Sequence, residues 1–300
     1  MLNNRVAPWN GIGTDIAGTK TVAEALKIGG LDWNIDQVPL IYEGIDTGYT
    51  MNVRDSDKNV LGVVGGRYKP VQNEAAFQFV EELIGEGVTF EKVGATNNAK
   101  RIWFLAKFPD TEILGEPMEP YICLTNSHDG FGSLKVFMTP IRVFCSNMIN
   151  LAMRDSKRMW SVRHTGSINS KLHEAKRTMG LANDYMEHLK VEAETLAKIK
   201  VAPKQYEALA SRLFPITEEM SQRKENSQIL LREQLNAAWT MDDLGSIGGT
   251  GWGFVNAVSD MVTHKEPARK TENQRENAFM YHLDEPTILN NAYKMVKELV

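Results

Sequence analysis

Three residue types that nucleophilic catalysis uses lie close together between residues 125 and 147. The segment TNSHDGFGSLKVFMTPIRVFCSN contains His128, Asp129 and Cys145, and such types can combine in a cysteine-dependent catalytic triad. Asp129 is followed by glycine, however, and Asp-Gly is a strong turn signal. Cys145 shares an alternating face with Ile141 and Val143, which is typical of a core strand, and a buried thiol without a cationic neighbour is unreactive. The pattern therefore favours a turn and a core position over a triad.

The sequence indicates no metal site and no phosphate-binding loop. The six histidines contain no pair at i and i+4, and the chain has no Cys-x-x-Cys, so a metal site would require His128, Asp129 and His164 to meet in the fold. The glycine-rich stretch GSIGGTGWG, residues 245–253, lacks the lysine and the hydroxyl residue of a P-loop. It is typical of the entry into a helix. We therefore expect no metal and no other cofactor.

A more specific signal comes from three strand-like segments that pair basic with aromatic residues. Residues i and i+2 of a strand share a face. The residues that share such faces are Arg101, Trp103 and Lys107 in segment 100–108, Lys135 and Phe137 in segment 134–139, and Arg142 and Phe144 in segment 141–145. A cationic groove with aromatic rings is what single-stranded nucleic acid requires, because every base offers a π-face and every nucleotide a charge. The alternative is that the rings are core beneath helices, with the basic side chains reaching solvent at the strand ends.

Basic residues are also concentrated in one part of an acidic chain. The formal net charge is −4, whereas residues 151–180 hold seven Lys and Arg against two acids, a local charge of +5. The residues of this segment that we expect at the rim of the groove are Arg154, Lys157, Arg158, Arg163 and His164. Such a segment can attract a polyanion, although a solvated helix face is equally compatible with it.

The order of the predicted elements indicates an α+β fold. Two alternating runs flank the polar turn DSDKN, a helix follows over NEAAFQFVEELI, and three or four further strands extend to about residue 148. From there the spacing is mainly helical, with residues 264–277 predicted as a polar loop. We expect an α+β domain over residues 1–165, with a mostly antiparallel sheet and a packed helix, followed by a helical region over residues 166–300.

The composition is ordinary for a globular protein and gives no sign of secretion. Hydrophobic residues make up 42% and charged residues 24% of the chain. Cys123 and Cys145 are the only cysteines, and both lie in apolar runs rather than in a disulfide framework. The first residues lack a basic region followed by an apolar core, and no window approaches about 18 apolar residues. We therefore expect a cytoplasmic protein without a membrane span.

Six ordered blocks resemble those of the phage/plasmid-like protein family known as domain of unknown function 932. The blocks are PWNGIGT, GRYKPVQNEAAFQFVEELI, LTNSHDGFGS, TPIRVFCSNMINLAM, HTGSI and GTGWGFVNAVSDMVTH, from Pro8 to about His264. Asn10 stands where the family often has histidine, and Met148 where threonine is common. The resemblance implies that the protein comes from a phage or another mobile element and leaves its activity open.

The order of hairpin, helix and antiparallel strands over residues 48–145 is similar to the core of single-strand annealing proteins of the RecT and Red-beta kind. This is a resemblance of element order. It implies a cytoplasmic phage recombinase that assembles on single-stranded DNA as a homo-oligomer, without ATP and without a catalytic residue.

Three hypotheses follow. The first is a phage- or plasmid-encoded protein that binds and anneals single-stranded DNA as a homo-oligomer through the basic–aromatic groove. The second is a host-interaction or inhibitor protein of a mobile element, with the acidic helical half as its contact surface for a host protein. The third is an enzyme centred on His128, Asp129 and His164.

Overall fold

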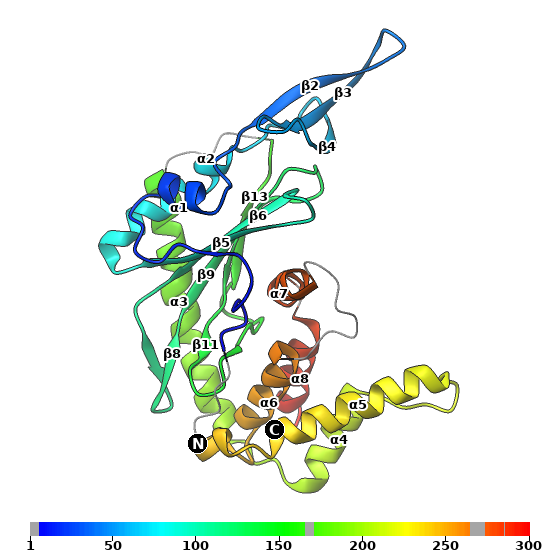
Figure 1. The fold of residues 1–300 in the computed structure, drawn as a ribbon. Coiled ribbons are helices and arrows are strands. Elements are labelled where there is room, and N and C mark those ends of the chain that lie inside the picture. Colours follow the sequence, from blue (N-terminus) through cyan, green and yellow to red (C-terminus); the bar gives the residue numbers. More distant parts are fainter. Residues whose placement is uncertain (1–5, 166–170, 265–273, 285) are drawn as a thin grey trace.

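The computed structural model describes residues 6–165, 171–264, 274–284 and 286–300 (Figure 1). An antiparallel sheet region forms the N-terminal half, and helices dominate the C-terminal half. The α+β class is therefore confirmed. One hydrophobic core contains residues of both halves, such as Phe104, Tyr185 and Val296. The predicted domain boundary near residue 165 thus lies within a continuous core and stays a prediction.

The central sheet has six strands in the order β1-β5-β6-β9-β10-β13, and every neighbouring pair is antiparallel. Its strands are β1 (Thr14–Asp15), β5 (Thr89–Thr96), β6 (Arg101–Lys107), β9 (Tyr121–Ser127), β10 (Leu134–Met138) and β13 (Met159–Val162). The register places Leu105 of β6 and Phe137 of β10 on either side of Cys123. The basic–aromatic faces predicted for these two strands therefore lie on the same side of the sheet.

Helices cover both faces of this sheet. One face packs against α1 (Val22–Ile28), α2 (Asn73–Phe77), the 3₁₀ segment η1 (Gln78–Glu86) and the long helix α3 (Lys171–Lys198). Ring contacts such as Phe77–Phe104 secure that packing. The other face is covered by α7 (Gln274–Asp284) and by the segment around Trp9, which together enclose a second apolar cluster (Figure 1). The prediction of a loop over 264–277 is wrong for residues 274–277, which begin α7; residues 265–273 lie outside the described part.

Two smaller sheets flank the central one. The first, in the order β12-β11-β8-β7, consists of β7 (Thr111–Ile113), β8 (Glu116–Glu119), β11 (Ile141–Arg142) and β12 (Asn147–Met148). The second consists of β2 (Ile35–Tyr42), β3 (Ile45–Arg54) and β4 (Val60–Gly65), and its hairpin β2–β3 projects from the body (Figure 1). Residues 35–54 of that hairpin are called the arm below.

The helical half is organised around α6 (Gly251–His264), in which every residue from Gly251 to Val262 is buried. Around it lie α4 (Pro203–Leu213), α5 (Gln222–Trp239), the 3₁₀ segment η2 (Asp242–Ile247) and α8 (Thr287–Lys297). The glycine-rich stretch leads into α6, as the sequence predicts. Among the described helices, none combines the length and the apolar composition that crossing a membrane requires.

The glycine at position 253 permits the close approach of α6 to the turn before it. A Cβ here would strike the backbone carbonyl of Ile247, which cannot move aside as a flexible side chain could. We predict that Gly253→Ala lowers the free energy of unfolding by about 1–3 kcal/mol, as overpacking does. Urea denaturation measures this change.

The matched control is Gly180→Ala in the exposed middle of α3. A Cβ at Gly180 meets no atom within 4 Å outside the local helix backbone, so alanine should raise stability by up to about 1 kcal/mol through helix propensity. Equal effects of the two substitutions would contradict the packing role of Gly253.

Candidate nucleic-acid interface

The aromatic residues predicted to stack on bases lie in the core. Trp103 and Phe137 are 0% and 1% exposed, beneath α7 and the segment around Trp9. The Trp103 indole Nε1 donates to Oε1 of Glu276 in α7 at 3.0 Å, and burial raises the pKa of that carboxyl. The prediction that these two rings form an open stacking face is therefore wrong, because α7 fills the space in front of them.

The basic side chains of the same face are engaged in ion pairs and hydrogen bonds with other residues of the protein. Lys107 Nζ lies 2.8 Å from a carboxylate oxygen of Glu119, and Lys135 Nζ lies 2.8 Å from the carboxylate of Asp284 at the end of α7. Arg158 donates to a backbone carbonyl at the same end of α7 at 2.7 Å. Lys135 and Arg158 thus connect the sheet to α7, and Lys107 pairs with an acid of β8. The structure therefore does not leave the three cations as an open row of phosphate ligands.

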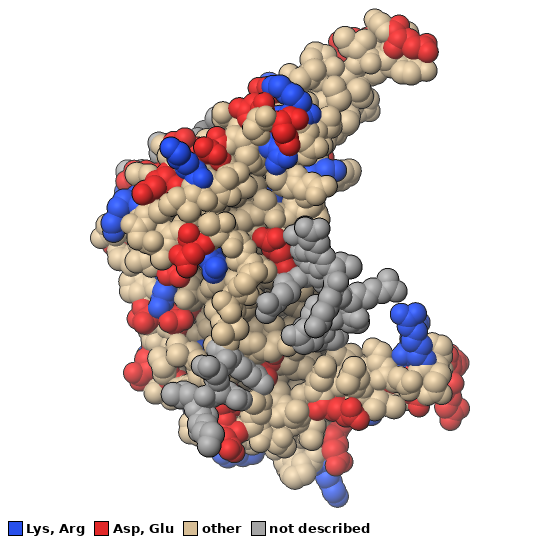
Figure 2. Space-filling view, in the orientation of Figure 1, with Lys and Arg blue, Asp and Glu red and all other residues tan. Residues whose placement is uncertain are grey.

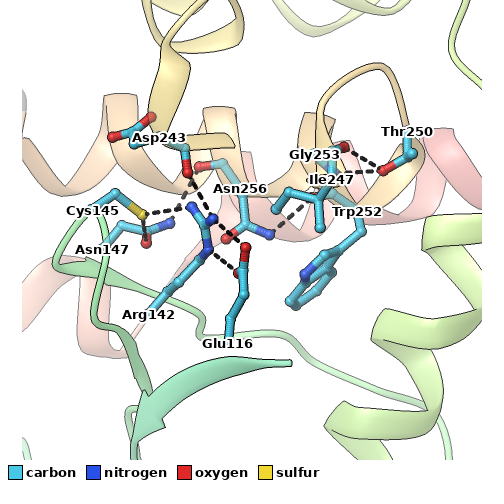
Figure 3. Close-up of polar contacts among 10 residues, drawn as sticks. All are labelled: Glu116, Arg142, Cys145, Asn147, Asp243, Ile247, Thr250, Trp252, Gly253 and Asn256. Carbon is cyan, nitrogen blue, oxygen red and sulfur yellow. Dashed lines mark hydrogen bonds and ion pairs between the residues drawn. The ribbon is translucent and has the colours of Figure 1, made fainter. Parts of the chain in front are cut away.

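Arg142 belongs to the four-stranded sheet and is almost fully buried. Its Nε and Nη2 donate to the two carboxylate oxygens of Glu116 at 2.6 and 2.8 Å, and Nη2 also donates to the backbone carbonyl of Asp243 at 2.8 Å (Figure 3). The assignment of Arg142 to DNA contact is therefore wrong. Phe144 beside it is 36% exposed, with the Arg142 guanidinium carbon 5.6 Å from its ring centre.

Cys145 has a cationic neighbour that its sequence pattern does not indicate. Arg142 Nη1 lies 3.3 Å from the Cys145 sulfur, and the thiol in turn donates to Oδ1 of Asn147 (Figure 3). Burial nevertheless raises the pKa of the thiol, with Arg142 opposing that shift. The thiol thus serves as a buried donor, and the prediction of a core position for Cys145 is confirmed.

His128, Asp129 and His164 do come together, at the end of the central sheet, but not as a catalytic centre. Asp129 Oδ1 accepts from Ser127 Oγ at 2.6 Å and from the backbone N–H of Phe131 at 2.9 Å, which confirms the predicted turn. His128 is fully buried, and burial lowers its pKa to about 3. A neutral imidazole without access to solvent cannot serve as a general base for a substrate. Within the described residues, no three potential ligands converge in an arrangement that could hold a metal ion.

An open pocket of about 420 Å³ lies next to these residues. It is lined by Val63, Val64, Gly65, Gly66, Arg67, Tyr68, Asp129, Gly130, Phe131 and Thr165, and is called the sheet-end pocket below. Tyr68 stacks on the His164 ring with centroids 4.9 Å apart, and its hydroxyl donates to the Ser127 carbonyl at 2.9 Å. Phe131 is 95% exposed. The pocket therefore combines a fixed aromatic wall with a free aromatic ring.

Several basic residues lie at this end of the sheet. Arg101 pairs with Ser127 at the start of β6, and Arg163 follows the end of β13. The backbone N–H of Lys69 donates to the His164 carbonyl at 2.6 Å, so the loop that carries Arg67 and Lys69 packs beside Arg163. Arg67, Lys69 and Arg163 are exposed. Arg101 is partly buried and also lines a second pocket of about 350 Å³ next to α7.

The twelve residues predicted for the interface are thus separated into groups. Arg101, Arg163 and His164 lie at the same end of the sheet as the pocket, but none of them lines it. Arg101 lines the second pocket next to α7, and His164 is buried as a packing partner of Tyr68. Arg154 and Lys157 are exposed in the loop that precedes β13, at the opposite end of that strand. The strand-face reasoning missed the pocket itself. Its signals in the sequence were the Gly-Gly-Arg-Tyr run at 65–68 and the phenylalanine directly after Asp-Gly at 129–131.

Comparison with known proteins identifies one family. The model of the family described as "Domain of unknown function (DUF932)" matches residues 60–282, a range that includes every residue lining the sheet-end pocket. The matched range contains five of the six sequence blocks, and the first block, PWNGIGT at residues 8–14, lies before it. No curated protein and no solved structure matches the chain, so the resemblance to annealing proteins stays a prediction.

We predict that Arg142→Met lowers the free energy of unfolding by about 3–5 kcal/mol, because it leaves the Glu116 carboxylate without its buried partner. The matched control is Arg212→Met, which breaks the Arg212–Glu298 pair with the same 2.6 Å separation on the exposed surface. That change should cost at most about 1 kcal/mol. Wild-type stability in Arg142→Met, measured by urea denaturation, would contradict the structural role.

The buried histidine predicts acid sensitivity. An unfolded histidine titrates near 6.5, and the pKa of folded His128 is about 3. Between these values the unfolded chain binds a proton that the folded protein excludes, so stability falls on acidification by up to about 1.4 kcal/mol per pH unit. Burial also lowers the pKa of His164, which adds to the effect.

His128→Gln should therefore flatten the decline in unfolding free energy between pH 6.5 and 4. His188→Gln removes an exposed histidine of α3 and serves as the control, with the wild-type slope expected. An equally steep decline in both variants would show that another group causes the acid sensitivity.

Proposed function

We propose that this chain, which belongs to the DUF932 family, is a phage- or plasmid-encoded protein that binds single-stranded DNA and promotes annealing as a homo-oligomer in the cytoplasm. The observation that carries the proposal is the sheet-end pocket, where an exposed phenylalanine ring and an exposed arginine border the same space. Stacking and charge are the two interactions by which proteins hold single strands without reading their sequence.

The pocket suits one nucleotide base. Its volume of about 420 Å³ is within the range of small-molecule sites. Phe131 offers both faces of its ring at the pocket mouth, whereas the Tyr68 ring already stacks on His164. Gly130, at a φ of +85°, is the residue that allows the tight turn presenting Phe131. A base could therefore stack on a freely accessible ring whose backbone position the turn fixes.

The surrounding charges suit the phosphates. Arg67, Lys69 and Arg163 are exposed and packed around one loop contact, and Arg101 lies at the same sheet end. The acid in the pocket, Asp129, accepts hydrogen bonds within its own turn. Four cations would give an affinity that decreases with salt, because bound phosphates release their counterions.

Annealing itself requires no reacting side chain. It requires that bases remain accessible while the backbone is neutralised, and that several copies act along one strand. This part of the proposal comes from the resemblance to single-strand annealing proteins. The buried, unpaired thiols of Cys123 and Cys145 are compatible with a reducing compartment.

Fluorescence anisotropy with a labelled oligonucleotide tests the proposal. We predict that wild-type protein binds at low salt and weakens as salt is added. Phe131→Ala should lose about 1–3 kcal/mol of binding free energy, the usual value of one stacked base. Arg67→Ala should bind more weakly and reduce the salt dependence by about one phosphate contact.

The control is Arg223→Ala, which removes the same charge from the exposed surface of α5 in the helical half. It should bind like the wild type. Undetectable binding of the wild type at low salt, or equal losses in Arg67→Ala and Arg223→Ala, would refute the proposed site.

A further inference from the structure

The arm exposes large apolar side chains that the rest of the described chain leaves uncovered. Ile41, Tyr42, Ile45 and Tyr49 are between 55% and 67% exposed. Strand β4 pairs with β3 only over residues 49–53, so residues 40–48 form a two-stranded ribbon. An isolated two-stranded ribbon is marginally stable in water, and clustered exposed apolar residues mark protein contacts. The tip of the arm therefore has the properties of a docking element.

The charge of the arm disfavours nucleic acid as its partner. The arm contains Asp36, Glu43 and Asp46, and its one basic residue, Arg54 at the base, pairs with Asp57. Acidic side chains lie at the tip in Figure 2, without a basic one beside them. A polyanion would be repelled there. The fitting partner is a protein surface that offers positive charge around an apolar centre.

The chain itself carries such a surface along β13, the outer strand of the central sheet. Met159 is 37% exposed on this strand. Exposed Arg154 and Lys157 precede it in the chain, with exposed Asp155 between them. This surface is called the basic edge below. The arm of the same copy points away from the body (Figure 1), so its tip is available to a second copy.

We propose that the arm of one copy docks on the basic edge of a second copy. The acids of the tip would lie against Arg154 and Lys157, and its apolar side chains would cover Met159. The two surfaces differ, so the contact is head-to-tail and repeats from copy to copy, which yields a ring or a filament.

The base of the arm is part of the sheet-end pocket. Asn52 of β3 donates from Nδ2 to the backbone carbonyl of His128 at 2.8 Å, and β4 supplies Val63, Val64 and Gly65 to the pocket wall. A second copy that holds the tip of the arm would thus also restrict the motion of the β4 residues that line the sheet-end pocket. Self-association through the arm does not depend on the proposed DNA binding, because its contacts involve protein alone.

The test is mass photometry of the full chain over a concentration series without oligonucleotide. Wild-type protein should form higher assemblies as concentration rises. Ile45→Lys should raise the concentration for half-association at least tenfold, whereas Ile28→Lys, a similarly exposed isoleucine on α1, should not. Wild-type protein that stays monomeric throughout, or equal behaviour of the two variants, would overturn the proposal.

Charge reversal identifies the docking surface. The double variants Glu43→Lys/Asp46→Lys and Arg154→Glu/Lys157→Glu should each associate at least tenfold more weakly alone. A mixture of the two should regain association, because reversed arms then meet reversed edges. A mixture that stays dissociated would overturn the pairing of arm and basic edge. Thermal melts matching the wild type confirm that the exposed substitutions leave the fold intact, and anisotropy with oligonucleotide reports separately on the proposed function.

Discussion

The cover that α7 places over the second face of the central sheet determines which surfaces remain available for function. The hydrogen bond between Trp103 and Glu276 joins residues 173 positions apart, and the ion pair between Lys135 and Asp284 fixes the end of the same helix. Both faces of the sheet are thereby buried. A ligand can approach the sheet only at its ends and edges, and the sheet-end pocket lies where β6 starts and where β9 and β13 end.

A second buried contact joins the sheet region to the helical half. Arg142 on β11 binds Glu116 of the neighbouring strand and the backbone carbonyl of Asp243 in η2 with one guanidinium. Since a planar guanidinium can serve several acceptors in fixed directions, one residue aligns a strand pair with the turn that leads into α6. Asn147 extends the contact to the backbone of Asn256 in α6 at 3.2 Å. The two halves therefore share polar contacts as well as a continuous core, which agrees with their packing as one body.

Local patterns in the sequence predict the elements well and the exposed surfaces poorly. Alternation correctly separates Phe104 from Trp103 on β6, and Asp129-Gly130 correctly predicts a turn. Alternation reports only that the two faces differ. It cannot show which face is covered, because the cover over Trp103 is a helix that starts in a polar segment and lies far along the chain. The same combination of a basic and an aromatic residue describes an open stacking groove and a core face with paired cations at its border. Tertiary contact with α7 decides between them, and so Phe131, in a turn that no strand pattern includes, was not predicted.

The distribution of charge explains how a chain with a net charge of −4 could bind a phosphate at one surface and a second copy of itself at another. Interactions between exposed charges are screened beyond about 10 Å at 0.1 M salt, so a bound phosphate responds to Arg67 and Arg163 nearby rather than to the acids elsewhere. The acidic tip of the arm and the basic edge lie on separate elements, and each would attract the other in a second copy. The base of the arm reaches the pocket through Asn52 and β4. A protein contact at the tip would therefore order the same hairpin that borders the sheet-end pocket, and under the proposed function it would connect assembly to the retention of a single strand.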